Sequence, residues 1–274
     1  MLDTLVIPFS NLLPGSKPQR PHEITNHIIH HCGARVLGSL TAEHMCPASF
    51  AEDIFNRSPT KAQLKMLHAG GRNQRLNVLT APATGTTTAG AMLALHRLLT
   101  HRNHRVLIIS PKRSMFLHCA ELMRESDHDL MIDGRILFSV RLTDGFWASE
   151  EAEWGVQWLS MEDLPLHHIG HMIANAQTII IDNAHQYSPD FLRELNRKIA
   201  REQQLIVIGK DANRALTEFE QDEAFKTVRL RIDQTWLPHP RYINMKREQY
   251  RDYPETYERI FQMPITWVPK PWRA

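Results

Sequence analysis

The stretch between residues 76 and 113 constrains the fold more than any other part of the sequence. It begins with a short apolar run at 76–79 and continues into a turn of threonine and small residues at 80–88. Leucine and methionine then recur at helical spacing as far as Leu99, and a second apolar run follows at 106–109. This order predicts a βαβ unit, in which two parallel strands of one sheet are connected by a helix packed across them.

The turn in this unit has part of the chemistry of a phosphate-binding loop. In such a loop glycine allows close backbone approach, the helix N-terminus supplies N–H groups, lysine reaches the β- and γ-phosphates and a hydroxyl holds Mg²⁺. The sequence has the glycine, Gly85, but no lysine. With Gly85 as the last loop glycine, Thr86 replaces the lysine and Thr87 supplies the hydroxyl. If the motif is shifted by one residue to fit the helicase form, Thr87 replaces the lysine and Thr88 supplies the hydroxyl. The expected nucleotide-binding residues of the loop are Thr84, Gly85, Thr86, Thr87 and Thr88.

A later apolar run, 178–181, predicts a buried strand that ends in an acidic residue, Asp182. An aspartate at the carboxyl end of a central strand, beside a phosphate loop, is placed to hold Mg²⁺ through water. The alternative is a buried structural aspartate. The next position normally supplies the carboxylate that polarises the attacking water, but Asn183 is an amide and cannot accept that proton. The candidate catalytic residues are Asp182, Asn183 and His185, of which His185 is a weak substitute.

With residues 110–113 and the apolar run at 205–209, these motifs resemble in order and spacing the ATPase domain of a phage terminase large subunit, the DNA-packaging motor. Superfamily 2 helicases of the DEAH type share the features. The resemblance covers residues 58–235 and implies an α/β fold of the RecA-like P-loop NTPase type, with a mostly parallel central sheet and helices on both faces. It also implies ATP and Mg²⁺ as cofactors, with the metal held by Asp182 and Thr87. The degenerate Walker A and Walker B motifs imply a pseudo-ATPase with weak or no hydrolysis.

The resemblance assigns roles to residues outside the loop. Gln63 corresponds to a glutamine that contacts adenine; alternatively, it is a surface residue of an amphipathic helix capped by Ser58. Residues 110–113 correspond to a DNA-facing motif; alternatively, they are a strand end with two solvated bases. Lys210 follows the strand at 205–209 and is a candidate to replace the missing lysine. The residues expected to bind double-stranded DNA are Arg102, Arg105, Lys112 and Arg113.

Charge is distributed unevenly along the chain, although the formal net charge is only +2. Residues 61–120 contain nine basic residues and no aspartate or glutamate, whereas 121–165 contain eleven acidic and three basic residues. Residues 226–274 contain ten basic and five acidic residues. A basic block around a phosphate loop favours binding of a polyanion such as DNA. The alternative is a solvated positive face that pairs with the acidic segment.

Composition excludes a disordered chain and a membrane span, since 42% of the residues are hydrophobic and 23% charged, with no run near the ~20 apolar residues a span needs. The N-terminus lacks the basic region of a secretory signal, so we expect a cytoplasmic protein, in the host cytoplasm if it is viral. Zinc is not expected, because the spacing of the candidate ligands lacks the pairs of structural zinc sites. These candidates are His27, His30, His31, Cys32, His44 and Cys46.

Three regions are expected along the chain: an N-terminal arm or subdomain at 1–57, the ATPase-like domain at 58–235, and a proline- and aromatic-rich tail or linker at 236–274. The prolines predict an irregular, broken tail whose aromatic residues either fold back on the domain or bind a partner. Within the domain, a strand is expected at 136–142, and 143–162 is interpreted as an insertion or edge hairpin. No acidic nuclease cluster and no second motor domain follow, so we expect a split or truncated motor or a repurposed one. The partners would be DNA and packaging subunits such as a nuclease subunit or portal. The alternatives are an inactive scaffold or regulator, or one half of a split helicase.

Overall fold

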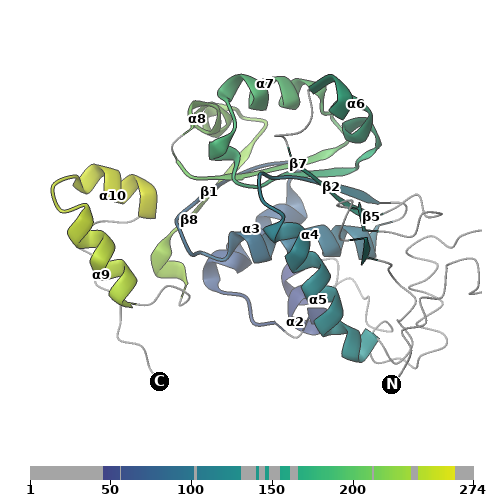
Figure 1. Ribbon diagram of the computed structural model, residues 1–274, viewed down its shortest axis with the longest axis horizontal. Coiled ribbons are helices and arrows are strands. Elements are labelled where there is room, and N and C mark those ends of the chain that lie inside the picture. The colour runs from purple at the N-terminus through teal and green to yellow at the C-terminus, as the bar shows by residue number, and fades with distance from the viewer. Residues whose placement is uncertain are drawn as a thin grey trace, which may run out of the picture.

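In a computed structural model of the protein, six parallel strands form the centre of an eight-stranded sheet (Figure 1). The structure describes residues 46–55, 57–101, 104–130, 140–141, 146–147, 155–160, 166–211, 213–235 and 240–262. Across the described residues the strand order is β3-β4-β5-β2-β6-β7-β1-β8. The strands are β1 (Arg75–Thr80), β2 (Arg105–Ile109), β3 (Val140–Arg141), β4 (Phe146–Trp147), β5 (Gly155–Leu159), β6 (Thr178–Ile181), β7 (Gln204–Gly209) and β8 (Lys226–Leu230).

The central strands are apolar runs, as expected of parallel strands that are covered on both faces. Every residue of β6 and β7 is buried. Parallel ladders join β5 to β2, β2 to β6, β6 to β7, β7 to β1 and β1 to β8. At the other edge, β3 and β4 are antiparallel. Because β7 comes late in the chain but pairs with both β1 and β6, it separates the strand before Gly85 from the strand before Asp182.

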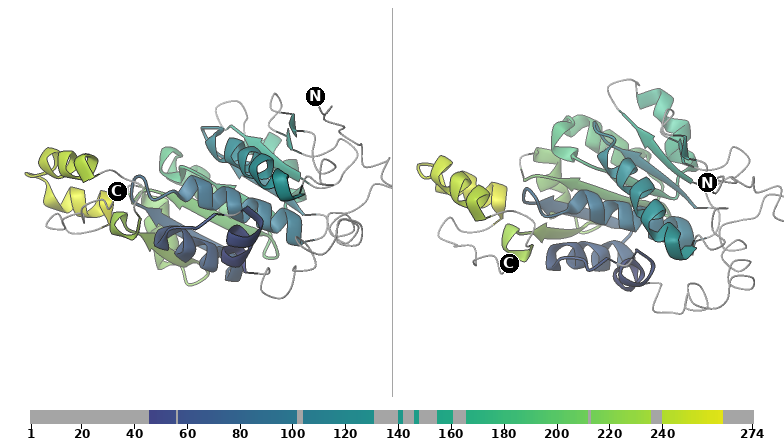
Figure 2. Two further views of the ribbon diagram at one scale, coloured as in Figure 1. Left: turned by 90° about the horizontal axis from the view of Figure 1, so that it is seen from below. Right: turned by 60° about the horizontal axis from the view of Figure 1, so that its bottom comes forward.

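Helices cover both faces of this sheet (Figures 1 and 2). One face carries α2, α3, α4 and α5, and the other carries α6, α7 and α8, each over its own hydrophobic cluster. The predicted α/β fold with a mostly parallel sheet is therefore confirmed. The helices on the two faces are α2 (Pro47–Phe55), α3 (Lys61–Arg72), α4 (Thr86–Thr100), α5 (Ser114–Leu130), α6 (Leu166–Asn175), α7 (Pro189–Lys198) and α8 (Arg214–Gln221).

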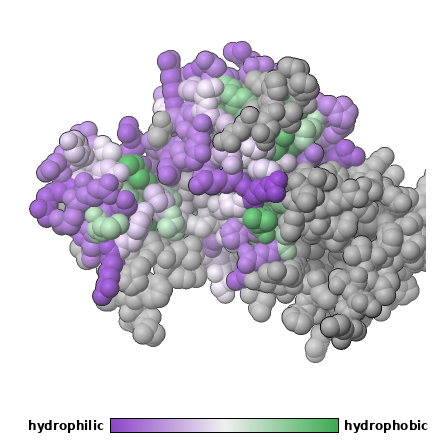
Figure 3. Space-filling model, viewed as in Figure 1, coloured by the Kyte–Doolittle hydropathy of each residue, from purple (hydrophilic) through white to green (hydrophobic). Residues whose placement is uncertain are grey.

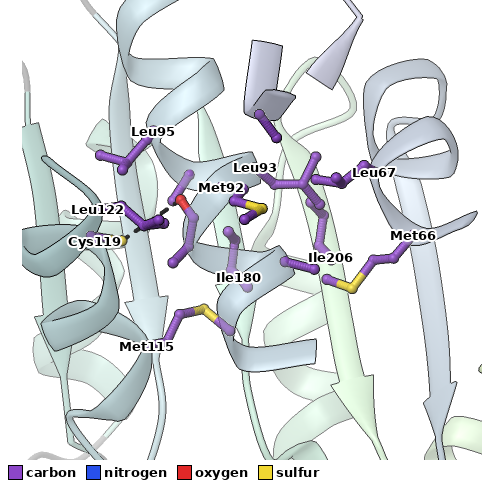
Figure 4. Packing of buried hydrophobic residues seen from close by; sticks show 14 of the residues in the cluster. Met66, Leu67, Met92, Leu93, Leu95, Met115, Cys119, Leu122, Ile180 and Ile206 are labelled. Carbon is purple, nitrogen blue, oxygen red and sulfur yellow. Dashed lines mark hydrogen bonds between the residues drawn. The ribbon is translucent and has the colours of Figure 1, made fainter. Parts of the chain in front are cut away.

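The larger cluster lies where α3, α4 and α5 meet the sheet (Figure 4). Met66 from α3 and Met92 from α4 point toward Ile180 and Ile206 of the central strands. Gly90 lets α5 approach the backbone of α4, because a Cβ atom there would lie 2.3 Å from Cε of Met115. The helix after the loop is therefore fixed by the sheet on one side and by α5 on the other.

The predicted N-terminal arm is described only in part. Residues 1–45 lie outside the described residues, and with them all the zinc candidates except Cys46, whose Sγ is 3.5 Å from Nδ1 of His68. Helix α2 packs into the larger cluster through buried residues such as Phe50 and Phe55. Residues 47–55 of the expected arm are thus part of the domain's core.

Segment 143–162, expected to be an insertion or edge hairpin, contributes a strand to the central sheet. Strands β4 and β5 are antiparallel, as in a hairpin, but β5 also pairs in parallel with β2. Trp158 of β5 is half-buried, and its Nε1 donates a hydrogen bond to the backbone oxygen of Ser110 at 3.1 Å. Of the strand expected at 136–142, only residues 140 and 141 lie among the described residues, as β3.

On the face shown in Figure 3, the described residues are mainly hydrophilic, with hydrophobic residues as separate spots. The exposed large hydrophobic residues are Leu117, Met245 and Tyr253. Scattered exposure of this kind is ordinary on protein surfaces. In the part of the chain that the structure describes, no helix combines the length and the apolar composition that crossing a membrane requires.

Residues 240–262 form a helical hairpin, which corrects the expectation of an irregular, proline-broken tail (Figure 1). Helices α9 (Pro240–Gln249) and α10 (Pro254–Phe261) each begin with proline, at the position where its missing N–H costs nothing. The aromatic rings of Tyr257 and Phe261 stack with centroids 4.4 Å apart. Both rings are buried in a cluster with Ala81 and Ile232 of the domain.

The hairpin is also joined to strand β8 by a polar contact. Arg229 of β8 donates from Nη1 to Oε1 of Gln262 at 2.8 Å. The described part of the tail therefore packs against the domain, as one of the two alternatives for its aromatic residues requires. Trp236, Trp267 and Trp272 lie outside the described residues.

Deletion of residues 236–274 is expected to destabilise the domain, because it removes Tyr257 and Phe261 and uncovers Ala81 and Ile232. The loss of unfolding free energy should be on the order of 3 kcal/mol, given about 1.5–3 kcal/mol for each large apolar side chain buried. Thermal unfolding with a dye that binds apolar surface measures it. The full chain with Tyr253→Ala, which alters an exposed residue of the same hairpin, is the control. An unchanged melting temperature after deletion would contradict this packing.

Candidate nucleotide-binding site at the carboxyl edge of the sheet

The loop between β1 and α4 has an N-terminus suited to an anion. Gly85 is the N-cap residue of α4 in the left-handed conformation, with φ 74°, and it makes no side-chain cap to the helix. The first N–H groups of α4 therefore have no capping side chain, and they lie at the positive end of the helix dipole. Thr86, Thr87 and Thr88 form the first turn and are partly exposed. Such a helix end binds phosphate through backbone N–H groups.

Buried hydroxyls hold the shape of this loop. The Oγ1 atoms of Thr80 and Thr84 are 2.6 Å apart, so one hydroxyl donates to the other, and the second donates to the backbone oxygen of Ala81, which lies 3.0 and 2.9 Å from the two atoms. Thr84 is only 1% exposed. Its hydroxyl is thus bonded within the loop, although the sequence motif places Thr84 among the nucleotide-binding residues.

Gln63, the expected adenine contact, lies directly beside the loop. Its Nε2 donates to the backbone oxygen of Gly85 at 3.1 Å, while its Oε1 accepts from the backbone N–H of Thr60 at 2.8 Å. The second bond belongs to a capping box, in which Thr60 caps α3. The predicted cap, Ser58, is therefore wrong: α3 begins at Lys61. The Thr-x-x-Gln spacing was the sequence signal for this cap. Both polar groups of the Gln63 side chain bind protein atoms.

Asp182 lies at the carboxyl end of β6, where its backbone N–H donates to the oxygen of Ile109 at 2.9 Å. The residue is 3% exposed. Burial raises the pKa of its carboxyl to about 6, although hydrogen bonds from Asn183 and the charge of Lys112 oppose the rise. The Asn183 side chain donates from Nδ2 to Oδ2 of Asp182 at 3.0 Å. A buried carboxylate at the same edge of the sheet as the loop has the chemistry of an oxygen ligand for magnesium.

Asn183 has a backbone conformation that explains its residue type. Its φ is 55° and its ψ is 36°, in the left-handed region. Asparagine is favoured there among residues other than glycine, and a longer side chain such as glutamate is disfavoured. The amide that replaces the usual glutamate is therefore the residue that this turn accepts most readily. Replacing Asn183 with glutamate would therefore strain the backbone of this turn as well as add a carboxylate.

His185 is a neutral group beside the next strand. Burial and the charge of Lys210 lower the pKa of the imidazole to about 4. Its Nδ1 accepts a hydrogen bond from the backbone N–H of Lys210 at 3.4 Å. Gly209 allows this approach, because a Cβ atom there would lie 3.1 Å from the backbone nitrogen of His185 and 2.6 Å from a side-chain carbon of Leu216. A side chain at this position would require Leu216 and the turn at His185 to shift.

The predicted DNA-binding residues lie on two opposite edges of the sheet. Arg105 is the first residue of β2 and lies at the amino edge, whereas Lys112 and Arg113 follow β2 at the carboxyl edge. The Arg113 guanidinium lies over the Trp158 ring, 4.6 Å from its centroid. Arg102 lies outside the described residues. The structure therefore brings Lys112 and Arg113 together at the edge with the loop and Asp182, and it separates Arg105 from them.

The glycine-containing loop on β1 and the acid after β6 lie at the carboxyl edge of one parallel sheet, where open α/β sheets bind ligands. This arrangement defines the class: the described residues adopt the RecA-like P-loop NTPase fold.

Among solved structures, this fold is similar to that of phage large terminase ATPase domains. The ATPase domain of the Thermus phage P74-26 large terminase gives a TM-score of 0.60 at 11% identity, covering 80% of this chain and 99% of that chain. A mutant form of that domain gives 0.59 at 12% identity, covering 80% and 98%. The large terminase of bacteriophage HK97 gives 0.59 at 13% identity, covering 82% of this chain and 55% of that chain. The sequence itself matches no protein-family model and none of the curated proteins. The likeness confirms the expected terminase-like fold.

Asp182→Asn is expected to stabilise the protein. The raised pKa means that the ionised carboxylate destabilises the folded state at neutral pH, by on the order of 3 kcal/mol. The gain should be fully present above the folded-state pKa of about 6 and should disappear as the pH falls below the ordinary value of 3.8, where the carboxyl is protonated in both states. Denaturant unfolding at several pH values measures it.

The matched control for this change is Asp252→Asn, which alters an exposed carboxylate. It should leave the pH dependence of stability as in the unaltered protein. A loss of stability at neutral pH in Asp182→Asn would contradict the conclusion that burial of this ionised carboxylate destabilises the folded state.

Proposed function

We propose that the chain is a terminase-like ATPase-fold module of viral DNA packaging, which binds nucleotide with weak or no hydrolysis and acts in the cytoplasm of the host. The observation that carries this proposal is the uncapped N-terminus of α4 at the same edge as the buried Asp182. The phosphates would lie against the backbone of Thr84–Thr88. Asp182 and the hydroxyl of Thr87 would hold Mg²⁺, which neutralises phosphate charge when it is bound.

Hydrolysis would be weak because the side chains that usually promote it are replaced. Thr86, the first residue of α4, occupies the lysine position when Gly85 is the last loop glycine, and it has no charge. Asn183 cannot accept a proton from water. His185 is neutral, but its Nδ1 already accepts a hydrogen bond from the backbone. This set of side chains favours binding over turnover.

Double-stranded DNA and packaging subunits, such as a nuclease subunit or portal, are the partners that this function requires. The basic residues at the carboxyl edge favour a polyanion, as does the acid-free segment 61–120. A second candidate is an inactive scaffold or regulator derived from a terminase or helicase motor. The loss of both the lysine and the glutamate favours it. Nucleotide binding separates the two, because a scaffold of this kind needs none.

ATP hydrolysis by the purified chain is expected to be negligible. Losing one electrostatic contact to the transition state typically lowers the rate about 10²–10³-fold, and here two groups are missing. Phosphate release with and without Mg²⁺ measures the rate, and Asp182→Ala is the control that removes the metal ligand. Turnover at the rate of an ordinary motor, abolished by Asp182→Ala, would refute the proposal of weak hydrolysis.

Duplex DNA is expected to bind at the carboxyl edge without sequence preference. Arg113→Glu should weaken binding to all sequences and reduce the slope of log affinity against log salt by about 1. Arg105→Glu, at the opposite edge of the same strand, is the matched control and should bind as the unaltered protein does. Fluorescence anisotropy over a range of salt concentrations measures both. An effect of Arg105→Glu alone would place DNA at the amino edge and contradict this assignment.

A further inference from the structure

Two lysines lie on either side of Asp182 at the carboxyl edge. Lys112 follows β2 and Lys210 follows β7, and both strands pair with β6, which Asp182 terminates. Beyond Lys210 lies β1 with the loop at 81–85, since β7 also pairs with β1. Along this edge, the strand order β2, β6, β7, β1 therefore gives Lys112, Asp182, Lys210 and then the uncharged loop.

The turn that carries Lys112 is fixed by contacts to β5. The backbone N–H of Ser110 donates to the oxygen of Leu159 at 3.1 Å, and the Ser110 oxygen accepts from Nε1 of Trp158 at 3.1 Å. Arg113 lies over the same indole ring, so its charge is directed toward β5. The Ser110 hydroxyl accepts from the backbone N–H of Lys112 at 3.2 Å.

Lys112 therefore differs from Arg113 in its surroundings. Its side chain is exposed, and the strand that it follows, β2, pairs with β6, which Asp182 terminates. Lys112 therefore emerges at the strand end next to that of the acid.

The position of Lys210 is equally fixed. Its backbone N–H is held by the His185 imidazole, and the preceding Gly209 packs tightly against the turn at 184–185. The Lys210 side chain is exposed. Among the described residues, no ion pair involves either Lys112 or Lys210. These two exposed lysines lie at the strand ends on either side of Asp182, where they are available to a polyanion.

We propose that Lys112 and Lys210 supply the positive charge that the loop lacks, and that they bind the polyphosphate chain of a nucleoside triphosphate from the two sides of Asp182. This assignment rests on the proposed nucleotide binding. It gives the site a preference for triphosphates, because two separated cations engage a longer chain of phosphates better than a shorter one. It also assigns Lys112 to the nucleotide and not to DNA.

The experiment compares the affinities of the full chain for ATP and ADP, measured by calorimetry in the presence of Mg²⁺. The variants are Lys112→Ala, Lys210→Ala, the double alanine variant and Lys112→Arg. The matched control is Lys226→Ala, because Lys226 is an exposed lysine at the amino end of β8. Thermal unfolding of each variant confirms that it is folded.

Each single alanine variant should lose about tenfold in affinity for ATP and less for ADP, as expected for about one charge-assisted contact. The double variant should lose more than either, Lys112→Arg should retain most of the affinity, and Lys226→Ala should bind as the unaltered protein does. The salt dependence of ATP binding should fall with each lysine removed, which a purely structural role would not produce.

Two different failures are distinguishable. If the unaltered protein binds ATP and both alanine variants bind it equally well, the assignment of the lysines is overturned and the proposed function stands. If the unaltered protein binds neither ATP nor ADP, both are overturned. Loss of affinity for duplex DNA but not for ATP in Lys112→Ala would return Lys112 to a DNA-binding role and overturn the assignment.

Discussion

The backbone ladder that holds β7 between β1 and β6 is the constraint on which the candidate site depends. Leu79 of β1 pairs with Gly209 of β7, and Ile181 of β6 pairs with Val207. These registers fix where each strand ends, so the loop, Lys210 and Asp182 emerge side by side at one edge. Shifting one ladder by a residue would move these strand ends relative to one another, and it would exchange the side chains that β6 and β7 bury against the helices of the two faces.

The parts of the fold that could be predicted from the sequence are those whose burial is complete. The apolar runs at 76–79, 106–109, 178–181 and 205–209 are covered on both faces, so composition alone identifies them as strands. Strand β5 is an edge of the parallel part, with half-buried Gln157 and Trp158 and an acidic segment before it, and the sequence therefore suggested a hairpin only.

Two further features were missed because a local signal was misinterpreted. Pro240 and Pro254 were interpreted as breaks, although each starts a helix, and Tyr257 and Phe261, at helical spacing, form the buried face of the second one. For the candidate site residues, the sequence predicts only which end of a strand each one follows. It is enough to place Arg105 and Lys112 at opposite ends of β2. The hydrogen bonds of the Gln63 and Thr84 side chains depend on tertiary contacts, which residue spacing does not predict.

The shape of the loop is held by protein contacts from three directions. The hydroxyls of Thr80 and Thr84 bond inside it, Gln63 holds Gly85 from α3, and Ala81 belongs to the cluster that Tyr257 and Phe261 form in the hairpin. A loop whose conformation is maintained in this way has little conformational entropy left to lose when an anion binds, so binding costs less. The features that fix the loop are separate from those that speed hydrolysis. For this reason a chain that lacks the loop lysine and the water-polarising glutamate can keep the conformation of the phosphate-binding loop. The missing positive charge can be supplied by residues at neighbouring strand ends, without a change in the loop.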